Sequence, residues 1–165
     1  WPGFKPRRRL KPPLVLDTVM TTIHVLGGAL WVGSVVCVAG VILPAATGGA
    51  LDAAPLETIA DRLVYLSRGA SVVMLLTGGH LAGTGYTVAS LTGSARGHLV
   101  LGMLALWFVF TALVEIGRGR LVDGLREKRV RAPASAATGV FRAAAVVGTL
   151  LLVDAGLLSS GIVLY

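Results

Sequence analysis

An apolar run of 28 residues, from Asp17 to Pro44, constrains this chain more than any other feature. The run reads DTVMTTIHVLGGALWVGSVVCVAGVILP and contains a single histidine, His24. About 20 apolar residues at about 1.5 Å each cross a bilayer core, so a helix of this length crosses with some tilt. Because polar groups are costly in hydrocarbon, His24 is a candidate functional residue.

The composition of the whole chain agrees with a membrane location. Hydrophobic residues make up 55% of its 165 residues and charged residues 14%, and its mean hydropathy is +0.80. Such a chain has too little polar surface to enclose a soluble core. Three further apolar runs follow the first, joined by short connections. We therefore predict an all-α fold, a four-transmembrane-helix antiparallel up-down bundle that makes a multi-pass membrane protein.

The predicted organisation is a short arm followed by one transmembrane domain. Residues 1–13, WPGFKPRRRLKPP, form a basic, Pro-rich juxtamembrane arm, because prolines and mutually repelling charges prevent a regular helix. The transmembrane domain takes residues 14–165, with helices expected at about 15–44, 60–89, 97–122 and 138–164.

The formal charge of +7 gathers outside the apolar runs, in the arm and in the linker before the last helix. Basic clusters beside membrane spans meet anionic lipid headgroups, so the lipid bilayer is the first expected partner. The arm offers a second contact, with subunits of a larger membrane complex. No nucleic-acid recognition fold or set of base-stacking aromatics accompanies these charges, which argues against nucleic acid.

Three deep polar side chains are expected in one half of the membrane. His24, His80 and Asp154 each lie about 9 or 10 residues from the same membrane face, or about 13 to 15 Å by the helical rise. Placing ionisable side chains inside a membrane costs free energy, so a set of three such residues indicates a functional role. Asp154 is expected beside the histidines as a proton partner or supporting carboxylate.

Glycines adjoin both histidines. Gly27 and Gly28 lie about one turn beyond His24, and Gly83 lies about one turn beyond His80. A flat macrocycle needs such a clearing next to its ligands. The pattern therefore predicts a bis-histidine haem b site held by His24 and His80.

Copper is the alternative occupant. Met20 lies one turn before His24. Met103 lies about five residues into the third predicted helix, in the same half of the membrane. Soft thioethers beside imidazoles suit Cu(I). The candidate metal ligands are thus His24, His80, Met20, Met103 and Asp154.

A purely structural interpretation stays open beside these two. Small residues let membrane helices approach closely, and an intramembrane histidine also serves as a hydrogen-bonding link between helices. In the other half of the membrane, Arg68 and Glu115 are expected to form a structural ion pair, because a paired charge costs less there than a lone one.

The pattern of His24, Trp31, Gly33 and Leu43-Pro44, followed by YLSRGASVVMLLTG, resembles the copper-resistance D (CopD-like) family of prokaryotic, especially archaeal, membrane proteins. It resembles more distantly the HemJ-type membrane protoporphyrinogen oxidases, which share a four-helix layout. The resemblance implies a prokaryotic cell membrane location and a role in copper passage or delivery. The oxidase relatives imply a haem b ligand at His24 only. Their third-helix lysine has no counterpart in GHLVLGMLALW, which argues against oxidase activity.

Three functions are consistent with these observations. A haem would make the protein a redox or electron-transfer component, and copper would make it a transport or delivery component. Without a cofactor it would be an accessory subunit of a larger membrane complex. No G-x-S-x-G, Walker-type loop or H-E-x-x-H is present, so no catalytic residue is assigned.

Overall fold

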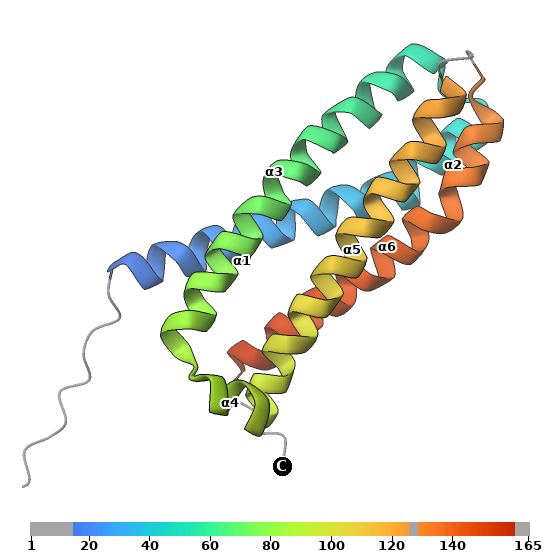
Figure 1. Cartoon of the computed structure of the whole chain (residues 1–165). Coiled ribbons are helices and arrows are strands. Elements are labelled where there is room, and N and C mark those ends of the chain that lie inside the picture. Colours follow the sequence, from blue (N-terminus) through green and yellow to red (C-terminus); the bar gives the residue numbers. More distant parts are fainter. Residues whose placement is uncertain (1–14, 126–128, 161–165) are drawn as a thin grey trace, which may run out of the picture.

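The computed structural model describes residues 15–125 and 129–160 of the chain (Figure 1). Every element within these ranges is a helix, which confirms the predicted all-α class for this part of the protein. The basic arm of residues 1–13 lies outside the described residues.

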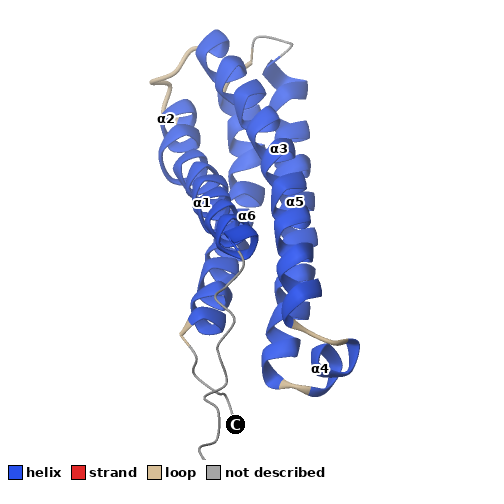
Figure 2. Ribbon diagram, turned by 90° about the vertical axis from the view of Figure 1, so that its left-hand side faces the viewer, coloured by secondary structure: helices blue, strands red, loops and turns tan. Residues whose placement is uncertain are grey.

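Long helices run side by side along the molecule and are joined at its two ends (Figure 2). The helix α5 packs most extensively on α6, and α1 packs mainly on α3 and α6. In chain order the elements are α1 (Val15–Cys37), the π-helical segment η1 (Val38–Ile42), α2 (Leu43–Thr47), α3 (Ala53–Gly85), α4 (Val88–Gly93), α5 (Ala95–Leu125) and α6 (Arg131–Ser159).

Three helical stretches are long and apolar enough to cross a membrane. They are Val15–Thr47, which comprises α1, η1 and α2, and the helices α5 and α6. This supports a multi-pass membrane protein. The helix α3 is not in this set, and it carries Asp61, Arg62 and Arg68 within its length.

The first long helix continues past Pro44, where the sequence predicted its end. The amide of Leu43 donates to the carbonyl of Val38, five residues back, so the chain makes a π turn before the proline. Pro44 then occupies the first turn of α2, directly after the π turn. The helix ends at Gly48, and Gly49 follows with a φ of 81° that suits glycine.

Two other helices begin earlier than predicted. The helix α3 begins at Ala53 rather than near residue 60, and α6 begins at Arg131 rather than near residue 138. Pro55 and Pro133 lie in their first turns, a position that proline tolerates. Both helices therefore extend beyond the uninterrupted apolar runs from which their bounds were predicted.

The connection between α3 and α5 contains the short helix α4, where the sequence predicted continued helix and then a turn. The helix α3 ends at Gly85, and Thr87 caps α4. The Thr87 hydroxyl accepts from the Ser90 amide at 3.2 Å, and the Thr87 amide donates to the Ser90 hydroxyl at 2.9 Å. This reciprocal capping box satisfies two amides at a helix start and fixes the reversal.

The packed core is centred on Trp31, which is 2% exposed. Its indole meets the ring of Phe110 edge-on, with ring centroids 4.7 Å apart and an interplanar angle of 67°. Its Nε1 donates to the hydroxyl of Ser67 at 2.9 Å. One side chain of α1 thus links α3 with α5, through a hydrogen bond and a favourable aromatic contact.

Candidate functional site

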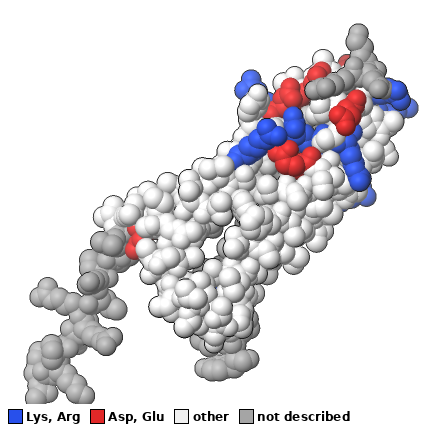
Figure 3. All heavy atoms as spheres, in the orientation of Figure 1, with Lys and Arg blue, Asp and Glu red and all other residues white. Residues whose placement is uncertain are grey.

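A cavity of about 560 Å³ lies between α1, α3, α5 and α6, and its volume is typical of small-molecule sites. Figure 3 shows charged side chains gathered at the end where α3 begins and α5 ends, and a hollowed, almost uncharged surface in the other half of that face. The cavity wall is mainly apolar, and its chemically distinctive members are His24, Met74, Met103 and Trp107.

The imidazole of His24 is held in one tautomer by α3. Its Nδ1 lies 2.8 Å from the hydroxyl oxygen of Thr77, and that hydroxyl donates its own hydrogen to the carbonyl of Val73 at 2.7 Å. A hydroxyl has one hydrogen, so toward His24 the Thr77 oxygen acts as the acceptor. This arrangement favours the tautomer of the neutral ring with its hydrogen on Nδ1 and a lone pair on Nε2.

A glycine on α3 makes room for this ring. A Cβ on Gly78 would lie 2.9 Å from Cε1 of His24, closer than such contacts allow. The imidazole therefore rests directly against the backbone of α3, beside Thr77. Gly28 lines the cavity as the sequence predicted for a clearing, whereas Gly27 and Gly83 are not part of its wall.

His80 has a different environment from His24. Its Nε2 lies 3.0 Å from Oδ1 of Asp17, near the start of α1, and it is not one of the residues that line the cavity. Figure 1 shows α1 crossing α3 at an angle. The helix α3 ends at Gly85 rather than near residue 89, so His80 lies five residues from its end, whereas His24 lies nine residues into α1. The two histidines therefore lie at different levels and do not share one cavity wall.

The other candidate metal ligands are divided in the same way. Met103 lines the cavity, but Met20 and Asp154 do not. Asp154 is buried between helices, with 8% exposure, and no described residue forms a hydrogen bond with its Oδ1. Within residues 15–125 and 129–160, no group of three or more His, Cys, Asp or Glu side chains is arranged to hold a metal ion.

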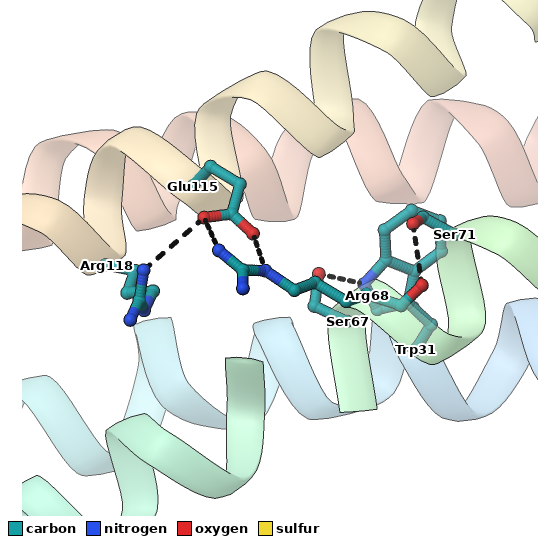
Figure 4. A network of polar contacts seen from close by, with 6 residues as sticks. All are labelled: Trp31, Ser67, Arg68, Ser71, Glu115 and Arg118. Atoms are coloured by element: carbon teal, nitrogen blue, oxygen red, sulfur yellow. Dashed lines mark hydrogen bonds and ion pairs between the residues drawn. The ribbon is translucent and has the colours of Figure 1, made fainter. Parts of the chain in front are cut away.

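The ion-pair candidates lie together in the charged half of the molecule (Figure 4). Arg68 on α3 donates to both carboxylate oxygens of Glu115 on α5, with Nε to Oε1 at 3.0 Å and Nη2 to Oε2 at 3.3 Å. Arg118 adds a contact of 3.7 Å from its Nη1 to Oε2 of Glu115. This forked contact joins α3 to α5 away from the cavity.

Exchange of these two charges should test the contact. We expect Glu115→Arg to lower the thermal midpoint of the purified protein in detergent, because it places like charges against each other. The double variant Arg68→Glu with Glu115→Arg should recover part of the loss, since it restores opposite charges at the same positions. Equal midpoints for the single and double variants would contradict a direct interaction.

Sequence reasoning missed Met74 and Gly78, two residues that shape the cavity. Met74 lines the wall, and a Cβ on Gly28 would lie 3.1 Å from its Cε. Met74 lies three residues before Thr77, which places both on one helix face, so the periodicity of α3 contained a signal for it. Gly78 had no such signal, because the importance of a glycine depends on what packs against it.

Comparison with known proteins gives no relative: no family model, curated protein or solved structure matches this chain. The site is therefore interpreted from its own geometry. An imidazole with one nitrogen hydrogen-bonded and the other available, in an apolar cavity that two methionines also line, can ligate a soft or borderline metal centre.

Proposed function

We propose that this chain is an integral membrane protein of prokaryotic, CopD-like type, with four membrane crossings formed by α1 with η1 and α2, α3, α5 and α6. Support for α3 as the fourth crossing comes from its outward side chains, because Tyr65, Val72 and Leu76 are 77%, 57% and 67% exposed. An apolar surface of this kind suits lipid contact. The helix also packs against α1 and α5 along the bundle.

The proposed function is redox or electron transfer by a haem b held in the cavity. The observation that supports it is the hydrogen bond from Nδ1 of His24 to Thr77, which leaves Nε2 as the free ligand atom. Histidines that ligate metals usually donate their other ring hydrogen in this way. A bound haem would supply one-electron chemistry, and the apolar wall would restrict water access to it.

The chain offers a different second ligand from the one predicted. His80 is engaged by Asp17, whereas Met103 lies in the wall of the same cavity as His24. Histidine with methionine is a ligand set that would hold a haem iron and raise its reduction potential. We therefore assign the ligand roles to His24 and Met103, with Gly78 making room for the His24 ring against α3.

Absorbance spectroscopy tests this assignment. The purified protein is expected to show Soret and α bands in its reduced-minus-oxidised difference spectrum, and His24→Ala should abolish them because the ligand nitrogen is lost. The matched control is His98→Ala, since the Nε2 of His98 lies 2.9 Å from the carbonyl of Thr92, outside the cavity wall. Undiminished bands in His24→Ala would overturn the haem assignment.

Copper transport or delivery is the second candidate, favoured by one observation. Met74, Met103 and His24 line one cavity, and thioether with imidazole is a donor set that selects Cu(I). Metal analysis of the purified protein would then show copper without a pigment, reduced in Met103→Leu. Absence of both copper and pigment would leave a cofactor-free scaffold or accessory subunit.

A further inference from the structure

A shallow groove of about 420 Å³ lies between α6 and the segment where α1 passes through η1 into α2. We propose that this groove binds one anionic phospholipid, with its phosphate held by Arg142 and an acyl chain lying along the groove. The lining residues are Val36, Ala39, Gly40 and Pro44 on one side, and Arg142, Ala145 and Val146 on the other.

Arg142 has no hydrogen-bond or ion-pair partner among the described residues, unlike Arg68, Arg118 and Arg120. Arg68 and Arg118 contact Glu115, and Arg120 reaches the carbonyl of Ala136 at 3.4 Å. The side chain of Arg142 is exposed, and no hydrogen bond or ion pair joins it to the described part of the chain. A cation on the membrane-facing side of a helix needs an anion, and in a bilayer the available anions are lipid phosphates.

The position of Arg142 matches the level of lipid headgroups. It lies eleven residues into α6, about 16 Å along the axis from Arg131, and the apolar stretch AAAVVG follows it directly. Side chains on a helix lean toward its N-terminus, which for α6 is the charged end of the molecule. The guanidinium therefore reaches from the edge of the apolar region toward the headgroups, where its planar donors match a phosphate.

The apolar part of the groove owes its shape to small residues and to the π turn. Gly40 lies within η1, and a Cβ there would have no neighbour within 4 Å. The small side chains of Ala39 on η1 and Ala145 on α6 leave space between the two walls of the groove. Val146, which also lines it, is 61% exposed. A cation at one edge of an apolar groove is complementary to a molecule with an anionic head and a hydrocarbon tail.

Native mass spectrometry provides the test. The full chain is reconstituted in nanodiscs with equal parts of phosphatidylcholine and phosphatidylglycerol, and the lipids retained after extraction into detergent are counted. We expect wild-type protein to retain phosphatidylglycerol preferentially. Arg142→Gln should weaken this preference about fivefold, the factor expected for one basic residue near an anionic surface. Arg142→Lys keeps the charge without the planar fork and should fall between the two.

Two further variants separate the groove from general surface charge. Gly40→Leu fills the groove without changing charge and should also reduce retention, whereas Arg120→Gln removes a charge elsewhere and should not. Circular dichroism and the thermal midpoint verify that each variant is folded. Equal retention of phosphatidylglycerol by wild type, Arg142→Gln and Gly40→Leu would overturn the proposal. Displacement of the lipid by inorganic phosphate alone would show an anion site without a lipid requirement and would also overturn it.

Discussion

Replacement of Gly148 by leucine is expected to disrupt the packing of α6 against α1 and α5. A Cβ at this buried position would lie 2.9 Å from Cε2 of Phe110 and 3.0 Å from Cγ1 of Val32. Those side chains are 0% and 4% exposed, so neither has space into which to withdraw. Overpacking a core costs about 1–3 kcal/mol, and a whole leucine side chain belongs at the upper end of that range. Unfolding followed by tryptophan fluorescence in detergent should show a midpoint lowered by about 6–12 °C.

The control for this substitution lies on the same helix. Gly139 is exposed, and a Cβ there would have no neighbour within 4 Å. Gly139→Leu should leave the midpoint unchanged or raise it, because leucine favours the helix over glycine by up to about 1 kcal/mol. A similar loss in both variants would mean that Gly148 does not pack against Phe110 and Val32 as described.

Hydropathy was a good guide to the long helices and a poor guide to their ends. An apolar run near Trp31 has few alternatives to a helix, because every backbone polar group must be satisfied internally in a membrane. The helix ends depend on local hydrogen bonding that hydropathy does not register. Pro44 was interpreted as a terminator, but the π turn before it lets the helix continue. Thr87 is a residue type favoured at helix starts, but Ser90 stands where a capping box usually has Glu or Gln, so the pattern in the sequence is weak.

The site shows a second limit of sequence reasoning. Depth along a helix follows from residue counting only where the helix ends are predicted correctly, and α3 ends at Gly85 rather than near residue 89. Which way a side chain faces across a pair of helices depends on their crossing angle and rotation, which the sequence does not specify. His80 meets Asp17 near the start of α1, whereas His24, seven residues further along α1, meets Thr77, so the two histidines lie at different levels of the bundle.

Under the proposed haem assignment, Gly78→Ala is expected to cause a large loss of cofactor although it leaves both ligands in place. The added methyl group would lie 2.9 Å from Cε1 of His24, so the ring must move away from α3. That movement breaks or lengthens the 2.8 Å hydrogen bond from Nδ1 to Thr77. Loss of such a supporting hydrogen bond lowers metal affinity by about 10–100-fold. Titration of apoprotein with haem, followed at the Soret band, measures the change.

Gly79→Ala is the matched control, because Gly79 is the next residue of α3 and also lines the cavity, but a Cβ there would have no neighbour within 4 Å. It should bind haem as wild type does. Thr77→Val removes the acceptor itself and should weaken binding as Gly78→Ala does, whereas Thr77→Ser retains the hydroxyl and should preserve it. If Gly78→Ala and Thr77→Val both bind normally while His24→Ala does not, His24 is a ligand whose position is set by other contacts. If Gly78→Ala, Thr77→Val and His24→Ala all bind haem normally, the haem lies elsewhere, because a haem held by Nε2 of His24 would be lost with the imidazole.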